Sequence, residues 1–596
     1  MNINSLESQS SSDQTVIQNV IIDTTFGKLL GSRHNVSGNL YNQFLSIPYA
    51  QPPINKLRFK KPEPLSSGTT SGDGMRQWDG IREANRWPPF CTQINLKQYE
   101  YLTKINNYDT QEDCLYLNIW TPSGGDLPKN LTVHQNGKLL PVIVYIHGGV
   151  FVYMGTSFDI FNGGLMASLG QLVFVSFNYR LGIFGFLDTG ADDYDNDDDS
   201  GGNDGIDKNV GFYDQILALN WVKQNIRQFG GDPDSITLMG QSAGAISIGL
   251  LMAAPEASHL FHRAILESSS PMQMKFFYEI SGHQFPRILQ LTNCGGSGRQ
   301  QRTVSQQYQC LRQVSAEDLN KIHEQLMTNT FMSFSPTIPS RVLPQFPREA
   351  FDPNLADNGI RQKQVLIGGN ADEGTLFLHQ IRPIEFPLDT VPDIRRETVS
   401  RLLADMSSGV RNLSDYQLDS LVDRIVGTDG SLSPEQLRHR IAEVIGDFLF
   451  KGPVIKFADS LSDWPNITVY MYYFTQRSGL LPEWIGSSHF EECQYVFGLP
   501  LRYPQMYGLS TDDSTTTTTT TATTVDEHRA FSRRLIETWS HFAKTGHMSR
   551  QLGSVWPRYR SGHGVHLELN ARKVSYGTKL NNTNYQLFDL AFESMV

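Results

Sequence analysis

The stretch at residues 235–249, SITLMGQSAGAISIG, limits most narrowly how this chain can fold, because an apolar strand pattern runs into an apolar helix pattern without a loop. The first five residues are apolar and partly β-branched, as buried strands are. Gly240 and Gly244 lack the Cβ atoms that would collide in so tight a turn. Ser242, between them, is expected to expose its hydroxyl at the turn, where it could act as a nucleophile. The alternative is an ordinary small residue at a strand–helix junction.

Other apolar runs of strand length alternate with helical patterns along the chain. Their hydrophobicity is continuous, which is typical of strands covered on both faces by helices. The sequence therefore predicts an α/β fold with a large central, mostly parallel, twisted sheet flanked by helices on both faces. Helices are predicted at residues 214–228 and 528–545. Strands are predicted at residues 140–146, 171–177, 235–239, 364–369 and 467–474.

The organisation predicted for the 596 residues is one large domain at 19–596 behind a disordered polar tail at 1–18. Two low-complexity stretches, an acidic one at 190–208 and a threonine-rich one at 510–525, are predicted as surface loops because element patterns resume on both sides. The acidic stretch does not fit the spacing of a calcium-binding loop, so a solvated loop is expected there instead of a metal site.

The composition excludes several classes of function. A formal net charge of −11 argues against a nucleic-acid partner, which calls for basic patches. No apolar run approaches the roughly 18 residues that span a bilayer, so no membrane span is expected. The chain also lacks the glycine patterns of nucleotide-binding loops. We therefore expect no cofactor and no metal, and the sequence leaves the oligomeric state open.

The five cysteines bear on the compartment in which the chain folds. Two pairs, Cys91 with Cys114 and Cys294 with Cys310, are near neighbours, so two disulfides and a free Cys493 are the simplest division. Disulfides indicate an oxidising compartment, although residues 1–18 lack the basic start and apolar core of a signal peptide. A secreted or ER-lumenal location is expected, with a cytoplasmic one as the alternative. Candidate glycosylation sequons are at Asn35, Asn130, Asn412, Asn466 and Asn581.

A glycine loop follows the predicted strand upstream of Ser242, in the phrase VYIHGGVF at residues 144–151. Backbone N–H groups in such a loop can point at an oxygen that develops negative charge, and removing one such donor costs about 3–4 kcal/mol of barrier lowering. A simple tight turn is the alternative interpretation.

Longer phrases carry a family resemblance. QFLSIPYAQPP, EDCLYLNIW, NYRLGIFGFL, FGGDPDSITLMGQSAGA and WPRY resemble the type-B carboxylesterase/cholinesterase family, whose members have the α/β-hydrolase fold. The matches run in order from about residue 20 to 570. The resemblance implies the G-x-S-x-G nucleophile turn at Ser242 and the family's two bridges, Cys91–Cys114 and Cys294–Cys310.

The resemblance also implies an acid and a base for Ser242. The family's acid lies in a D-E-G phrase, here GGNADEGTLF with Glu373, and its histidine precedes a YVFG phrase, here SSHFEECQYVFGLP with His489. Taken singly, Glu373 could be a surface carboxylate and His489 only one of 15 histidines. Together they imply a Ser-His-Glu triad that transfers an acyl group to Ser242. The implied oxyanion donors are the backbone N–H groups of Gly149, Val150 and Ala243.

Three positions depart from the family pattern. Val150 stands where glycine or alanine is usual, and its branched side chain restricts the backbone while keeping the N–H. Gln241 stands where cholinesterases carry glutamate, and Lys104 stands where they carry a tryptophan that stacks on the choline cation. We therefore expect hydrolysis of uncharged carboxylic esters, with choline esters less suited. The alternative is a non-catalytic or slow-turnover binding member, similar to the neuroligin-like adhesion proteins, although the three triad residues and the lack of a span favour an enzyme.

Overall fold

The computed structural model describes most of the chain. The described residues are 14–65, 78, 80–94, 109–123, 138–190, 205–276, 284–297, 300–327, 334–355, 362–407, 415–427, 432–507 and 518–578.

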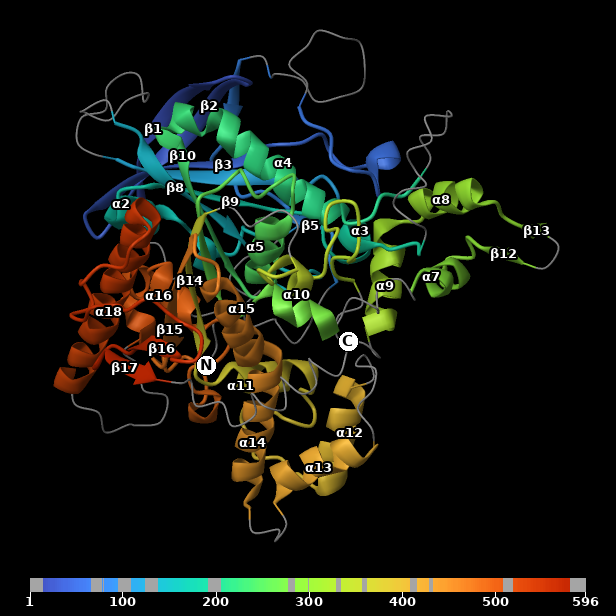
Figure 1. Cartoon of the computed structure of the whole chain (residues 1–596). Coiled ribbons are helices and arrows are strands. Elements are labelled where there is room, and N and C mark those ends of the chain that lie inside the picture. Colours follow the sequence, from blue (N-terminus) through green and yellow to red (C-terminus); the bar gives the residue numbers. More distant parts are fainter. Residues whose placement is uncertain are drawn as a thin grey trace.

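One large sheet organises the molecule (Figure 1). Within the described residues it has 13 strands in the order β1-β2-β3-β7-β9-β8-β10-β11-β14-β15-β16-β17, with β4 on β2. Strands β9 to β16 are parallel to their neighbours, and antiparallel pairs flank them on both sides. The strands are β1 (Gln14–Thr24), β2 (Gly27–Val36), β3 (Asn39–Pro48), β4 (Ile81–Glu83), β7 (Tyr116–Pro122), β8 (Leu140–Ile146), β9 (Val173–Phe177), β10 (Gly231–Gln241), β11 (Arg263–Glu267), β14 (Lys363–Asn370), β15 (Ile467–Phe474), β16 (Val565–Leu569) and β17 (Ser575–Thr578).

Helices cover both faces of this sheet, which explains why its central strands are apolar throughout. Along β8, Val142 and Val144 belong to one core cluster, and Ile143 and Tyr145 belong to another. Successive side chains of a strand point to opposite faces, so the two clusters are the two faces. Helices α4, α5 and α15 contribute to the first cluster, and α2, α16 and α18 contribute to the second. The sheet is therefore buried on both sides, as the sequence predicts.

The helices follow the connections between strands. They are α2 (Gly164–Gly170), α3 (Gly182–Phe186), α4 (Val210–Asn225), α5 (Ala243–Ala253), α7 (Phe285–Leu291), α8 (Val304–Gln313), α9 (Ala316–Met327), α10 (Pro347–Ala350), α11 (Glu373–Ile381), α12 (Arg396–Ser407), α13 (Asp415–Val426), α14 (Pro434–Gly446), α15 (Gly452–Ser462), α16 (Glu491–Val496), α17 (Leu499–Arg502) and α18 (Thr518–Thr545). A π-helix, η8 (Asp447–Lys451), joins α14 to α15. Short 3-10 helices are η2 (Asn55–Leu57), η4 (Asp159–Phe161), η6 (Ile226–Phe229), η7 (Pro271–Phe276), η9 (Glu483–Ile485) and η10 (Pro504–Tyr507).

A third apolar cluster lies apart from the sheet. It joins α11, α12, α13, α14 and η8 through side chains such as Phe377, Ile441 and Phe450. Figure 1 shows α12, α13 and α14 below the central strands, far from the N-terminal strands. This helical cluster is therefore packed around its own core, and η8 connects it to the sheet.

The predicted elements are found, although several of their boundaries differ. The strands predicted at 140–146 and 467–474 match β8 and β15, and the helix predicted at 214–228 corresponds to α4 followed by η6. The tail boundary at residue 18 is wrong, because β1 pairs with β2 from Gln14 onward. The threonine-rich loop predicted at 510–525 also extends too far, because α18 begins at Thr518. Threonines are tolerated in a helix that later residues stabilise by packing. Most of the acidic stretch lies outside the described residues.

Both expected disulfides are present. Cys91 is bonded to Cys114 and Cys294 to Cys310, and Cys493 is a buried free thiol. Such bridges are typical of proteins that fold in an oxidising compartment. Of the five sequons, Asn35 and Asn466 are described, whereas Asn130, Asn412 and Asn581 lie outside the described residues. Among the helices the structure describes, none combines the length and apolar character that crossing a bilayer requires.

Candidate active site

The turn between β10 and α5 presents Ser242 in an unusual backbone conformation. Its φ and ψ are 57° and −124°, a region that L-residues rarely adopt. A Cβ added at Gly244 would collide with the Ile146 carbonyl oxygen, and one added at Gly240 would lie 2.7 Å from the Gly244 carbonyl carbon. Ser242 N–H donates to the Glu267 carbonyl oxygen at 2.8 Å, which ties the turn to β11. The glycines are therefore required for the close approach of strand, turn and helix.

The glycine loop after β8 lies against this turn. A Cβ added at Gly148 would be 3.1 Å from Ser242 Cβ. Gly149 and Val150 have φ angles of 99° and 55°, so this loop also adopts a left-handed backbone. The structure gives no hydrogen-bond partner within the described part of the chain to the N–H groups of Gly149, Val150 and Ala243. These three predicted donors are thus not engaged by other described groups.

His147 anchors the loop from behind. Its ring stacks on Tyr179 with centroids 4.4 Å apart, its Nδ1 lies 2.8 Å from the Gly148 carbonyl oxygen, and the Tyr179 hydroxyl donates to the His147 carbonyl oxygen at 3.0 Å. Burial lowers the pKa of His147 to about 4, so the ring is neutral at pH 7. This neutral, buried histidine therefore stabilises the glycine loop.

Glu373 and His489 are in direct contact although 116 residues separate them. His489 Nδ1 lies 2.6 Å from Glu373 Oε2, and Asn370 N–H donates to the other carboxylate oxygen at 2.7 Å. The two segments are clamped by Ser487 N–H, which donates to Asp372 Oδ2 at 2.8 Å, and by Asp372 N–H, which donates to the Ser487 carbonyl oxygen at 2.9 Å. A buried carboxylate therefore fixes one side of the imidazole.

The other ring nitrogen faces the residue before Ser242. His489 Nε2 lies 3.1 Å from the side-chain nitrogen of Gln241. Between the described groups of the site, no hydrogen bond joins the Ser242 hydroxyl to His489. The structure thus brings Glu373 and His489 together and sets His489 beside the turn, with Gln241 as its direct contact.

Two acidic side chains are buried beneath the pair. Glu492 Oε1 accepts from the Ser268 hydroxyl at 2.6 Å and its Oε2 accepts from the Asn370 amide at 2.5 Å. Burial, and then the nearby Glu373 carboxylate, raise the pKa of Glu492 to about 7. Burial and Glu492 likewise raise the pKa of Glu267, which accepts from the Trp539 indole at 2.8 Å. Glu492 is therefore partly protonated near neutral pH.

An aromatic ring from η8 covers the imidazole. The centroids of Phe450 and His489 are 4.3 Å apart with an interplanar angle of 32°. Lys451, the next residue, donates to the Ala371 carbonyl oxygen at 3.3 Å and pairs with Asp447. The π-helix therefore contacts both His489 and the segment that carries Glu373. π-helical turns of this kind are frequent at functional sites.

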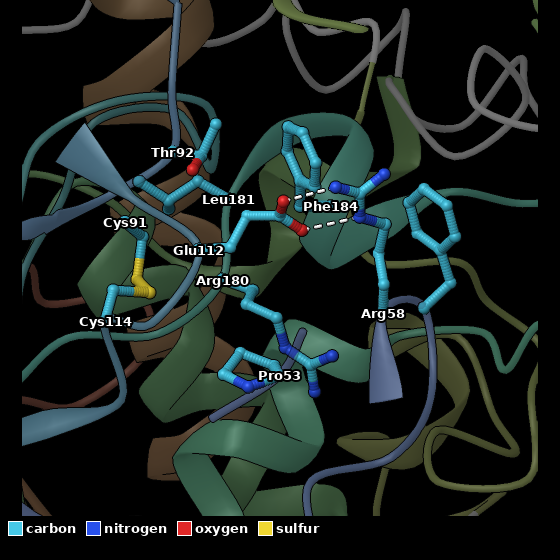
Figure 2. Close-up of a pocket in the computed structure, with 10 residues that line it drawn as sticks. Pro53, Arg58, Cys91, Thr92, Glu112, Cys114, Arg180, Leu181 and Phe184 are labelled. Carbon is cyan, nitrogen blue, oxygen red and sulfur yellow. Dashed lines mark hydrogen bonds and ion pairs between the residues drawn. A yellow bond between two sulfur atoms is a disulfide. The ribbon is translucent and has the colours of Figure 1, made fainter. Parts of the chain in front are cut away.

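A small cavity elsewhere is unsuited to the same chemistry (Figure 2). It lies beside the Cys91–Cys114 disulfide, with Arg58 paired to Glu112 and Arg180 paired to Asp214 at 2.7 Å. Its lining contains neither Ser242 nor His489. The cavity is consistent with a structural role for these ion pairs. In the described residues no group of three or more His, Cys, Asp or Glu side chains is arranged to hold a metal ion.

Sequence reasoning missed three of the contacts around His489. The sequence distinguishes Gln241 only by its lack of charge, and it predicts a functional role for neither Phe450 nor Glu492. The phrase HFEEC at residues 489–493 contains a signal for Glu492, since two acidic residues stand there inside an apolar stretch. No sequence pattern points to Phe450, because its position depends on how η8 packs against a segment far along the chain. Lys104 lies outside the described residues.

The fold and the strand–turn–helix around Ser242 define an α/β-hydrolase. The sequence profile of the carboxylesterase family matches residues 18–588, and the chain belongs to that family. It is 32% identical over 591 residues to a cholinesterase of Mus musculus, covering 97% of this chain and 88% of that protein. It is 30% identical over 583 residues to an acetylcholinesterase of Leptinotarsa decemlineata, covering 94% and 84%.

Proposed function

We propose that this protein is a serine hydrolase that cleaves uncharged carboxylic esters through an acyl-enzyme on Ser242. The observation that carries the proposal is the buried Glu373–His489 pair, 2.6 Å apart, whose outer nitrogen faces the strand–turn–helix of Ser242. This is the acid–base half of a triad beside a serine in a strained turn. Family membership supports the same chemistry.

In the proposed reaction, His489 Nε2 takes the Ser242 proton while the serine oxygen attacks the ester carbonyl carbon. Glu373 holds the imidazole by Nδ1 and stabilises its protonated form. The unengaged N–H groups of Gly149, Val150 and Ala243 would donate to the carbonyl oxygen as it becomes negative. The alcohol leaves with the proton from His489, and water repeats the sequence to release the acid.

The preference for uncharged substrates rests on two departures from the family's sequence pattern. Gln241 supplies a neutral amide where cholinesterases carry a carboxylate, and Lys104 would repel a quaternary ammonium instead of stacking on it. Both of the relatives named above carry cholinesterase names, so a choline esterase is the second candidate. A non-catalytic binding protein is the third. The disulfides and the exposed sequon at Asn466 support secretion.

A comparison of two esters separates these functions. We expect the purified protein to hydrolyse 3,3-dimethylbutyl acetate, the uncharged isostere of acetylcholine, with a higher kcat/KM than acetylcholine itself. Ser242→Ala should lower the rate with p-nitrophenyl acetate by about 10³-fold or more. Acetylcholine favoured tenfold would identify a choline esterase. Equal rates for the wild type and Ser242→Ala would identify a non-catalytic binding protein. A single burst of p-nitrophenol without turnover would identify a slow-turnover member.

A further inference from the structure

We propose that Gln241 is a positioning residue that holds the outer nitrogen of His489 in the resting enzyme and sets the lower pH limit of ester hydrolysis. This inference rests on the proposed function, in which that nitrogen is the base. The proposed role belongs to the side-chain amide of Gln241, whereas the backbone of this residue is part of the turn.

The side chain of Gln241 lies between Gly148 of the glycine loop and His489. Gln241 is the last residue of β10, its backbone is paired with Glu267 of β11, and its side chain is buried. Its nitrogen lies 3.1 Å from His489 Nε2, and a Cβ added at Gly148 would lie 3.0 Å from its oxygen. The amide therefore has little freedom to leave, but a half-turn about its last bond would exchange the two ends.

The proton positions follow from the partners. A carboxylate accepts hydrogen bonds, so Nδ1 of His489 carries a proton toward Glu373. The amide nitrogen of Gln241, 3.1 Å from Nε2, is placed to donate to that nitrogen when it presents its lone pair. This is the tautomer that a general base needs. The amide therefore keeps the reactive nitrogen in the correct form while occupying the lone pair that the Ser242 proton must reach.

This contact has a consequence for pH dependence. A hydrogen bond to the neutral form disfavours protonation of the ring, whereas a carboxylate at the same place would favour it. The charged groups that face His489 are Glu373, at 2.6 Å from Nδ1, and Glu492, whose carboxylate interacts with the ring electrostatically. Neither is altered by a change at Gln241. Gln241 should therefore shift the pH at which His489 becomes a base.

The test compares pH–rate profiles for p-nitrophenyl acetate in Gln241→Glu and Gln241→Met. We expect the acid limb of kcat/KM to move to higher pH in both, by about one unit for Glu and by less for Met. The matched control is Gln215→Met. Gln215 is a buried glutamine of α4 whose amide donates to Ser247 at 3.0 Å instead of to His489. Its acid limb should coincide with that of the wild type.

If the acid limb of kcat/KM lies at the same pH in both Gln241 variants as in the wild type while kcat falls, the proposal is overturned and Gln241 has only a packing role. A second readout does not depend on turnover. In Ser242→Ala protein with ¹³C-labelled histidine, the resonance lost in His489→Gln identifies His489, and its titration midpoint should follow the order wild type, Gln241→Met, Gln241→Glu. If no ester is hydrolysed but this order holds, the proposed function fails and the positioning role stands. An unchanged midpoint refutes the positioning role alone.

Discussion

The backbone of the glycine loop is strained at Val150. It has a φ of 55°, and left-handed backbone costs an L-residue roughly 1–2 kcal/mol. β-branched residues adopt this region least readily of all. The neighbouring Phe151 shares it at 64°. The loop keeps this geometry because its ends are fixed: Gly149 O accepts from Tyr153 N–H at 3.1 Å, and Phe151 O accepts from Gly182 N–H at 2.7 Å.

This strain predicts an inverted order of stability for two substitutions at Val150. In ordinary backbone alanine is more stable than glycine by about 0.5–1 kcal/mol, but glycine adopts positive φ without penalty. Val150→Gly should therefore be more stable than Val150→Ala by about 1 kcal/mol, as measured by urea unfolding. Val314, also partly buried but with a φ of −65°, is the control and should show alanine above glycine. The same order at both positions would show that Val150 is not strained.

At the scale of elements, the π-helix η8 supplies the aromatic ring that packs on His489. Strands β10 and β14 end near Ser242 and Glu373, and an isolated bridge between Asp372 and Ser488 brings the segment of His489 to them. η8 continues from α14 and places Phe450 over His489, with Phe377 of the helical cluster edge-on behind it at 5.3 Å. The helical cluster thus contacts the proposed base through the Phe450 ring as well as through Glu373 at the start of α11.

We expect Phe450→Leu to lower kcat for p-nitrophenyl acetate by about tenfold while KM changes little. The imidazole loses its flat wall, and small displacements of a catalytic group are expensive. The control is Phe457→Leu in α15, a buried ring that packs edge-on against Phe351 at 4.7 Å, away from His489. Both substitutions should reduce stability by about 1 kcal/mol. If kcat falls equally in both, loss of packing alone explains the effect.

The elements themselves were largely predictable, for identifiable reasons. Residues 140–146 and 467–474 are continuous apolar runs, and both are strands with those bounds. The strand predicted at 235–239, by contrast, begins earlier, at Gly231. The phrase GDPD resembles a turn in the sequence, but the backbone of Gly231 already pairs with Leu140 of β8. Composition likewise could not show that α18 begins among threonines. Local sequence therefore predicts the buried segments, and tertiary pairing decides their ends.

For the whole molecule, the site depends on contacts between segments far apart in sequence. The Gln241–His489 contact spans 248 residues and the Glu373–His489 contact 116. Family phrases could single out Ser242, Glu373 and His489, since each lies in a recognisable motif. They could not predict that the Ser242 hydroxyl is not bonded to His489 here, or that Gln241 takes that place. Such details follow from side-chain packing that no local pattern encodes.

The buried carboxylates make a prediction for the stability of the whole molecule. The pKa of Glu492 is raised to about 7 by burial and by Glu373, so the folded protein holds a proton that the unfolded chain releases near its usual value of about 4.5. Because the folded state binds this extra proton, the contribution of Glu492 to stability falls as pH rises from about 4.5 to about 7 and levels off above that.

Glu492→Gln removes this dependence. Its amide nitrogen can donate to Ser268, whose hydroxyl then accepts, and its oxygen can still accept from Asn370. The variant should therefore gain stability over the wild type between pH 5 and pH 8, by on the order of 1–3 kcal/mol, as measured by urea unfolding at both values. The control is Glu435→Gln, since contacts at the start of α14 lower the pKa of this exposed glutamate and give the opposite sign. If Glu492→Gln differed in stability from the wild type by the same amount at both pH values, the proton on Glu492 would not be the cause of the pH dependence.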